Sequence, residues 1–314
     1  MENIKSFAVS VQGYGHKIKG ICCQDSSLKY NADDYILISV CDGHGGESYF
    51  RSQIGSKIGV ETFKDCVQEL MKTDCIHDFL NSSSDTDPEL SNKFKRDFNA
   101  SFIHLVKNFI LNWRNKVYEH YNNNPFKETE MSRIADNNVK QRYLSGKNIY
   151  SAYGTTFLGV CYSKNLCFGF QIGDGDLVAQ NKNGDFFNLV EDDPKCVGNM
   201  TTSLCADDAF DNVRRFVLFK DDDDYPVAIF ASSDGVINSF DSRKNFEKFY
   251  SQIIAESTKD HNLEQELNDV LDDLSKNGSR DDVSLAGIIN HNSINIVGKD
   301  DLKDNCVSDM VKGH

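Results

Sequence analysis

Apolar and polar positions repeat with two different periods along the chain, and the change of period separates predicted strands from predicted helices. Near the start, apolar β-prone runs predict strands at residues 6–11 and 35–41. The stretch between them, QGYGHKIKGICCQDSS, is punctuated by glycines and predicts a hairpin-like connection. After Gly46, apolar residues recur at steps of three to five positions, which predicts a helix. These residues are Ile54, Ile58, Phe63, Val67 and Leu70.

Residues 79–149 interrupt this pattern and predict an insert of helices and loops. A polar stretch at residues 79–91 contains a helix-start signal, Asp-Pro-Glu, at 87–89. The long helix predicted after it carries an aromatic stripe over residues 94–113, which is more typical of a core-facing surface than of a ligand site. Residues 122–147 are polar and loop-like, with one more short helix expected among them. The insert is longer than a connection requires, so it could cover the rim of a site or dock a partner.

The second half of the chain has the pattern of short strands with short connections. The predicted strands lie in GTTFLGVCYS, LCFGFQIGDG, DLVAQNKNGDFFNLV, RRFVLFK, PVAIFASSDG and DDVSLAGII, with a hairpin turn at Asn183-Gly184. Helical patterns return at residues 246–255 and 263–274. Paired helices between groups of closely connected strands favour an α+β fold of antiparallel sheets with helices on their outer faces. We expect residues 1–292 to form a single domain and residues 293–314 a polar tail.

The composition excludes several classes of function. The chain has 48 acidic and 34 basic residues and a net charge of −14, so it is poorly suited to bind nucleic acid or anionic membranes. No window approaches about 18 uncharged apolar residues, and the N-terminal residues lack the apolar core of a signal peptide. Ten cysteines occur without a CxxC pair or a zinc-type spacing, which favours reduced thiols. We therefore expect a monomeric cytoplasmic protein with no nucleic-acid or membrane partner.

Acidic residues recur where predicted strands end. The clearest cases are Asp42-Gly43, Asp174-Gly175, Asp234-Gly235 and Asp281-Asp282, and Asp25 is a weaker one. Any one of them alone is most simply an ordinary turn. If several converged, their charges would repel and their pKa values would rise unless a cation lay between them. Mg²⁺ and Mn²⁺ take carboxylate and carbonyl oxygens as ligands, so the set indicates a hard divalent metal site.

Five motifs together carry a family resemblance. VCDGHGG, YGTTFLGV, QIGDGDLV, ASSDGVINSF and GSRDDVSLAGI occur in the order seen in the metal-dependent protein Ser/Thr phosphatases of type 2C, the PPM family. GHKIKGICCQDS and GNMTTSLCADDAFD resemble the bacterial-type branch of that family. The resemblance spans about residues 10–290 and is weakest over 79–149. It implies a four-layer α-β-β-α sandwich, two antiparallel sheets flanked by helices, with a metal centre at one edge.

The resemblance also implies which residues hold the metals, Mg²⁺ or Mn²⁺. Asp42 would bridge two ions, and Gly43 would give its carbonyl oxygen to one of them. Asp234 and Asp281 would hold the other ion. Asp174 matches the acid that, with Asp234, holds a third and weaker metal in some members.

The implied reaction is hydrolysis of phosphoserine or phosphothreonine in a phosphoprotein, which would oppose a Ser/Thr kinase. The ions activate water and neutralise phosphoryl charge. A Ser or Thr alkoxide leaves poorly, so His44 matches the need for a general acid beside Asp42. His16 is the candidate for a phosphate-contacting or supporting role, and a solvent-facing turn histidine is the alternative interpretation.

Some positions depart from the family pattern and keep a second hypothesis open. Many members have Glu where this chain has Gln24, so Asp25 becomes the candidate for the outer side of the second ion, through water. Asp282 replaces a common Asn and is expected to support the site rather than bind metal. The motif at Asp174 lacks the Arg that often follows it. The alternative is a catalytically impaired pseudophosphatase that binds phosphoproteins or acts as a scaffold. A calcium-binding structural protein is excluded because no 12-residue ligand loop is present.

Overall fold

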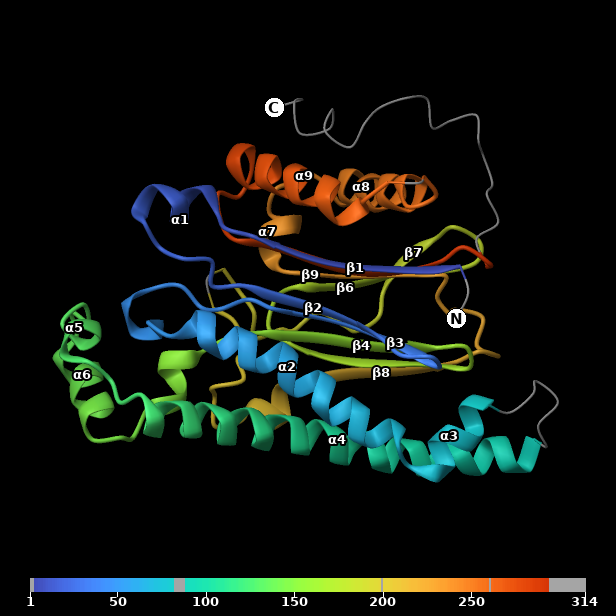
Figure 1. Ribbon diagram of the computed structural model, residues 1–314, viewed down its shortest axis with the longest axis horizontal. Helices are drawn as coiled ribbons and strands as arrows, with labels where there is room; N and C mark the ends of the chain where they lie inside the picture. Colours follow the sequence, from blue (N-terminus) through green and yellow to red (C-terminus); the bar gives the residue numbers. More distant parts are fainter. Residues whose placement is uncertain (1–2, 82–87, 199, 260, 294–314) are drawn as a thin grey trace.

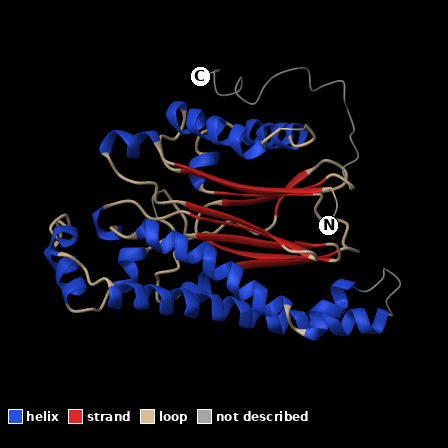
Figure 2. Ribbon diagram, in the orientation of Figure 1, coloured by secondary structure: helices blue, strands red, loops and turns tan. Residues whose placement is uncertain are grey.

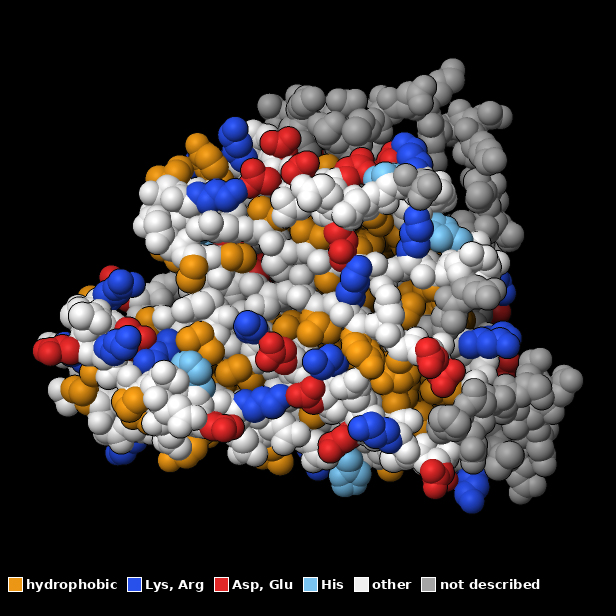
Figure 3. All heavy atoms as spheres, in the orientation of Figure 1, with side chains coloured by type: hydrophobic (Ala, Val, Ile, Leu, Met, Phe, Trp, Pro, Cys, Tyr) orange, Lys and Arg blue, Asp and Glu red, His pale blue; other side chains and the backbone are white. Residues whose placement is uncertain are grey.

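Two antiparallel sheets pack face to face, and helices cover both outer faces (Figures 1 and 2). The computed structural model describes residues 3–81, 88–198, 200–259 and 261–293. The four layers, α-β-β-α, confirm the predicted α+β sandwich. Lysine, arginine and acidic side chains alternate over the face seen in Figure 3, without a large patch of one sign. None of the helices in the described ranges combines the length and apolar character needed to cross a membrane.

One sheet joins the start of the chain to its end. Its strand order is β1-β10-β9-β6-β7, and all neighbours are antiparallel. The strands are β1 (Ile4–Val11), β6 (Asp176–Gln180), β7 (Phe186–Asn188), β9 (Ala228–Ser232) and β10 (Val283–Asn290). β1 pairs with β10 over its whole length, from Ile4 opposite Asn290 to Val11 opposite Val283. The helices α8 (Arg243–Glu256) and α9 (Leu263–Asn277) cover its outer face (Figure 1).

The other sheet has the order β2-β3-β4-β5-β8 and is covered by the long helices of the first half of the chain. Its strands are β2 (Ser26–Asn31), β3 (Tyr35–Cys41), β4 (Phe157–Ser163), β5 (Leu166–Ile172) and β8 (Arg214–Phe219). The covering helices are α2 (Ser52–Met71), α3 (Asp74–Asn81) and α4 (Pro88–Asn123). The remaining short elements are α1 (Tyr14–Lys19), η1 (Glu47–Tyr49), α5 (Glu128–Met131), α6 (Asn137–Leu144), η2 (Ile149–Tyr153), η3 (Ala209–Asn212) and α7 (Asp234–Ile237).

Strand β3 shows why the apolar runs are buried on both sides. Its residues alternate between the two cores, as the two-residue repeat of a strand requires. Ile36, Ile38 and Val40 pack between the sheets, while Leu37 and Cys41 face the helical layer. The strand is therefore anchored through both faces up to the residue before Asp42.

The predicted aromatic stripe belongs to the helical core. Phe98, Phe102, Phe109 and Trp113 of α4 are buried. The ring of Phe102 lies 5.2 Å, between centroids, from that of Phe168 on β5. Aromatic pairs in this range add stability beyond simple burial, so the stripe anchors α4 to the sheet and confirms the core assignment.

The hairpin-like connection predicted near the N-terminus is wrong. Residues Tyr14–Lys19 form the short helix α1, and β1 and β2 belong to different sheets. The helix buries none of its residues and has no side-chain cap. It is held instead by residues far away in sequence, since the N–H of Gly15 donates to the Arg280 carbonyl oxygen at 2.8 Å. A tertiary contact of this kind leaves no local sequence signal.

The insert is more helical than the polar sequence at 122–147 predicted. Two short helices, α5 and α6, replace the single expected one. The helix-start signal at 87–89 falls at the edge of the described residues, and α4 begins at Pro88. The division into one domain and a tail stays a prediction, because residues 294–314 lie outside the described ranges.

Candidate metal centre

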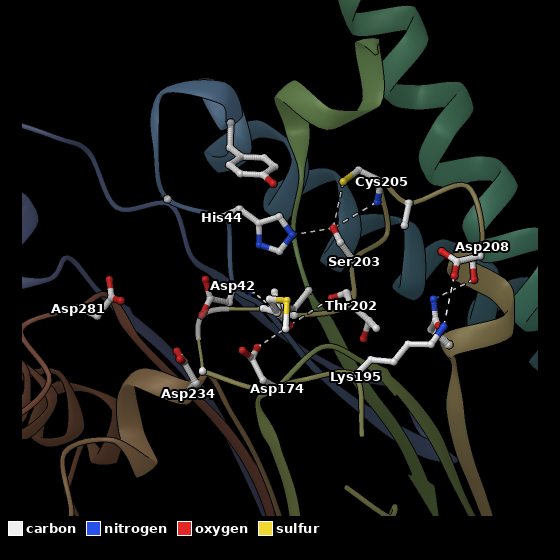
Figure 4. Close-up of a pocket in the computed structure, with 18 residues that line it drawn as sticks. Asp42, His44, Asp174, Lys195, Thr202, Ser203, Cys205, Asp208, Asp234 and Asp281 are labelled. Carbon is white, nitrogen blue, oxygen red and sulfur yellow. Dashed lines mark hydrogen bonds and ion pairs between the residues drawn. The ribbon is translucent and has the colours of Figure 1, made fainter. Parts of the chain in front are cut away.

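An acidic cavity of about 820 Å³ opens at the edge of the sandwich where both sheets end. Asp42 follows β3 and Asp174 follows β5, so one sheet supplies these two residues. Asp234 follows β9 and Asp281 precedes β10, so the other sheet supplies the second two. Figure 4 shows the four carboxylates around a common space. The strand ends that the sequence singled out therefore meet at one place.

The backbone around Asp42 is fixed by strand β4 and the turn before it. The N–H of Asp42 donates to Oγ1 of Thr156 at 3.0 Å, and the Asp42 carbonyl accepts from the Thr156 N–H at 2.8 Å. The hydroxyl of Thr155 donates to the same carbonyl at 2.8 Å. These bonds hold the main chain and leave the Asp42 carboxylate directed at the cavity.

Burial and mutual repulsion raise the pKa values of several of the acids. Burial, followed by the charges of Asp25 and Asp234, raises the pKa of Asp42 well above its ordinary value. Burial and the charge of Asp174 raise the pKa of Asp234 to about 6. Buried Asp25 has a raised pKa for the same first reason, and its Oδ2 atom has no hydrogen-bond partner among the described residues. A cation would relieve both the repulsion and the unpaired oxygen, so these residues fit a metal.

The cavity acids in the described residues do not bring three ligand atoms within 4.8 Å of one another. Among the described residues, only Glu256, His261 and Glu266 offer three ligand atoms within 4.8 Å of each other, and they lie away from the cavity, near α8 and α9. Hard divalent ions usually complete their shells with water or with a bound group. A spread set of carboxylates suits such ions better than a closed cage.

Gly43 stands at a close approach of two backbones. A Cβ atom there would lie 2.3 Å from the carbonyl oxygen of Gln24, so no other residue fits without moving the chain. Gly46, by contrast, has open space around it and a φ of 98°, which favours glycine for conformational reasons. The glycines of the motif therefore serve two different requirements.

His44 is oriented by a residue that the sequence did not single out. Its Nε2 lies 2.7 Å from Oγ of Ser203, whose hydroxyl also lies 3.0 Å from the Thr155 carbonyl oxygen. A carbonyl can only accept, so Ser203 can donate its proton to Thr155 and accept a hydrogen bond from Nε2 of His44. The other ring nitrogen, Nδ1, faces the side of Asp42 (Figure 4). Burial lowers the pKa of His44 to about 4.

Two neighbours of Ser203 also hold the site together. The hydroxyl of Thr201 donates to Oδ1 of Asp174 at 2.9 Å. That of Thr202 accepts from the N–H of Gly173 at 2.9 Å and donates to Asp193 at 2.8 Å. The motif containing these residues resembled the bacterial-type branch, but their individual roles could not be read from the sequence because the segment has no regular secondary structure.

His16 does not line the acidic cavity. Its Nδ1 lies 2.9 Å from Oδ1 of Asp282, and its Nε2 lies 4.0 Å from Oδ1 of Asp281. Asp282 also accepts from the N–H groups of Gly13 and Gln24, each at 2.6 Å. Burial opposes ionisation of Asp282, but these bonds outweigh it and lower its pKa. The hydrogen bond to Asp282 in turn raises the pKa of His16. The arrangement fits a supporting role for both residues.

Gln24 faces away from the acids. Its side-chain Nε2 donates to Oγ of Ser52 at 2.5 Å and to the His44 carbonyl oxygen at 3.2 Å. Its own carbonyl accepts from Ser56 at 2.6 Å. Gln24 therefore ties the His44 loop to helix α2.

Residues of the insert hold the segment that follows His44 through hydrogen bonds. Arg51 is 3% exposed, and its Nε and Nη2 atoms donate to the Glu130 carboxylate at 2.8 and 2.9 Å. Its Nη1 donates to the Tyr153 hydroxyl at 2.7 Å. The Tyr143 hydroxyl donates to the Ser48 carbonyl at 2.6 Å. Residues of α5 and α6 thus fix the turn that leads from the cavity into α2.

The sequence matches one known protein family. The sequence matches the family described as Protein phosphatase 2C over residues 12–272. PppA, a regulatory component of T6SS in Pseudomonas aeruginosa, is 14% identical, with 92% of this chain and 98% of that chain covered and a TM-score of 0.52. Serine/threonine phosphatase Stp1 from Staphylococcus aureus is 13% identical, with 91% and 94% covered and a TM-score of 0.51. At these identities the likeness shows the fold. No curated protein sequence matches significantly.

Proposed function

The chain belongs to the protein phosphatase 2C family, and we propose that it hydrolyses phosphoserine and phosphothreonine in phosphoproteins with the help of Mg²⁺ or Mn²⁺. The observation that carries the proposal is the acidic cavity, where two carboxylates from each sheet face one space. Burial and neighbouring carboxylates raise the pKa values of Asp42 and Asp234, and a bound divalent cation would offset this repulsion. A Ser/Thr kinase would be the opposing enzyme.

We assign the metal ligands from the motif positions and the cavity. Asp42 and the carbonyl oxygen of Gly43 would hold one ion, and Asp42, Asp234 and Asp281 the other. Asp174 would contribute to a third, weaker site, and the unpaired oxygen of Asp25 supports a water-mediated contact. When bound, such ions activate a water molecule at neutral pH and neutralise charge on the phosphoryl oxygens.

The protein groups around that site orient the reactants and move one proton. Water oxygen would bond to phosphorus and release one proton to solvent, while the bond from phosphorus to the Ser or Thr oxygen breaks and that oxygen takes one proton from the proposed acid. His44 is the proposed donor through Nδ1, because Nε2 lies in a hydrogen bond with Ser203 and Nδ1 faces the side of Asp42 (Figure 4). Burial alone keeps the imidazole neutral. A phosphate group carries nearly two negative charges and would favour the protonated ring as it enters.

The alternative is a pseudophosphatase or scaffold, which the departure at Gln24 keeps open. Gln24 was the reason for it, yet the Gln24 side chain bonds to Ser52 and the His44 carbonyl and not to the acids. The cavity is lined by four acids of the family motifs, Asp42, Asp174, Asp234 and Asp281. No observation favours the scaffold over the enzyme.

Turnover and metal binding, measured together, test the proposal. We expect p-nitrophenyl phosphate and phosphoserine peptides to be hydrolysed with Mn²⁺ or Mg²⁺, and EDTA to abolish the reaction. Asp42→Asn should remove activity, because it removes a bridging charge while keeping the side-chain shape. Asp223→Asn is the control, because the Asp223 side chain is fully exposed and does not line the acidic cavity. Calorimetric Mn²⁺ binding without turnover of either substrate would favour the scaffold.

A further inference from the structure

A second, smaller pocket adjoins the acidic cavity. It has a volume of about 360 Å³ and lies between helix α1 and the turn before β10. We call it the basic pocket. Asp281 lines both the basic pocket and the acidic cavity, so the two adjoin at this residue. Three other residues of the basic pocket have basic side chains, namely His16, Lys19 and Arg280.

Two of the basic side chains in this region already have a carboxylate partner. His16 bonds to Asp282, as described above, and Lys17 pairs with Asp272. Within the described ranges, Lys19 and Arg280 form neither an ion pair nor a hydrogen bond through their side chains, although the chain carries a net charge of −14. Two positively charged side chains that form no ion pair among the described residues therefore border a pocket at the edge of the acid site.

The backbone fixes Arg280 in place. Its N–H donates to the Ser275 carbonyl at 2.9 Å, and its carbonyl accepts from the Gly15 N–H at 2.8 Å. Its φ is 67°, a left-handed conformation that is uncommon for a residue with a side chain. The guanidinium carbon lies 5.1 Å from the centroid of the Tyr14 ring, within cation–π range. These contacts hold Arg280 where it lines the pocket.

We propose that the basic pocket is a substrate subsite for a second anionic group on the same phosphoprotein. The group would be an acidic side chain or another phosphate, close in sequence to the phosphorylated residue in the acidic cavity. The inference rests on the proposed function. An extended peptide advances about 3.3–3.6 Å per residue, so neighbouring pockets select for positions within a few residues of each other.

The expected preference is moderate, because Lys19 and Arg280 are exposed. Exposed ion pairs are individually weak, so two of them correspond to a gain of about three- to tenfold in kcat/KM. The gain should fade in high salt, since screening acts strongly on exposed charges. A second phosphate should give more than a carboxylate, because it carries more charge.

The test compares phosphoserine peptides that differ at one flanking position. Aspartate, a second phosphoserine or lysine is scanned through the three residues on each side of a phosphoserine with neutral flanks. We expect the aspartate and phosphoserine peptides to have higher kcat/KM than the neutral peptide at one or two positions, and the lysine peptides to have lower values. Comparison of the aspartate and phosphoserine arms identifies which anion the subsite prefers.

Variants of the pocket then assign the preference. Lys19→Ser and Arg280→Asn should each reduce the ratio of acidic to neutral kcat/KM, and the double variant should bring it to about one. Asparagine is chosen at Arg280 because it tolerates a left-handed φ. Lys19→Glu should shift the preference toward lysine-flanked peptides. Lys57→Ser, an exposed lysine on α2, is the matched control and should keep the wild-type ratio.

The outcomes separate the subsite from the proposed function. Turnover without any dependence on flanking charge would overturn the subsite, as would a dependence that persists in the double variant. If the wild type hydrolyses no substrate, the proposed function fails. Fluorescence anisotropy of labelled phosphopeptides with the Mn²⁺-loaded protein would then measure the ratio of affinities for acidic and neutral peptides. The same variants would be compared, and loss of this ratio in the double variant would support the subsite, while its persistence would overturn it.

Discussion

Replacing Glu130 by glutamine should destabilise the protein by about 1.5–3 kcal/mol. The change leaves buried Arg51 without its carboxylate partner, which now accepts two hydrogen bonds from the guanidinium. Removing one partner of a fully buried pair costs about 3–5 kcal/mol. The cost should be smaller here for two reasons. The Glu130 side chain is 25% exposed, so water can replace part of the interaction, and Arg51 keeps the Tyr153 hydroxyl and two main-chain carbonyls as acceptors.

The measurement is a double-mutant cycle by urea unfolding, with Glu130→Gln, Arg51→Met and the double variant. Glu128→Gln on the same short helix is the control, because Glu128 is exposed and has no part in the pair. A coupling energy below about 0.5 kcal/mol would refute the reasoning, since it would make the pair equivalent to a surface salt bridge.

The pH dependence of this variant has a defined sign. Burial opposes ionisation of Glu130, but the bonds from Arg51 and the Lys127 N–H outweigh it and lower its pKa. A carboxyl whose pKa is lowered by folding stabilises the folded protein when the pH is above its ordinary pKa of about 4.5. This stabilisation is lost as the pH falls through the lowered pKa of the folded state. The difference between the wild type and Glu130→Gln should therefore shrink below about pH 4.5.

Three further predictions concern the cavity. In EDTA, the free energy of unfolding should fall as the pH rises from about 4 to 7, because Asp234 has a pKa of about 6 in the folded protein and releases its proton earlier when unfolded. Asp234→Asn should flatten this slope in thermal melts, and an unchanged slope would contradict the assignment. His44→Ala should reduce turnover of phosphoserine peptides more than that of p-nitrophenyl phosphate, whose leaving group needs no proton, and equal losses would argue against a general acid. Gly43→Ala should weaken calorimetric Mn²⁺ binding, because its Cβ would lie 2.3 Å from the Gln24 carbonyl oxygen, and unchanged affinity would show that this close approach is not needed.

The core elements could be predicted because their patterns are local. Strand β3 is an apolar run between polar turns, and the structure gives it the predicted bounds, Tyr35–Cys41. Strand β2 could not be recognised in the same way. Its sequence, SSLKYN, has little apolar character, because it is an edge strand whose residues are only partly buried. Its pairing with β3, which starts at Ser26 opposite Cys41, depends on the rest of the sheet.

The site could be predicted in part for a similar reason. Acidic residues such as Asp42 stand directly after strands, and strand ends are visible in the sequence. Ser203 is 159 residues from His44 and lies in a segment without regular structure, so no spacing links the two. The partner of His16 was also hidden, because Asp282 comes from the turn before the last strand. The roles of such residues depend on partners that are distant in sequence, so they are visible only in the folded structure.

The position of β10 has a consequence for the protein during its synthesis. β10 lies between β1 and β9, so without it the first strand has no place in its sheet. The turn before β10 carries Asp281 into the cavity, and Asp282 accepts bonds from Gly13 and Gln24 near the start of the chain. A nascent chain that has not yet released residues 283–290 from the ribosome can neither close this sheet nor complete the acidic cavity. Pairing across nearly the whole chain is slow, so the growing polypeptide would leave its first strand exposed to chaperones and would gain any phosphatase activity only after translation of the last strand.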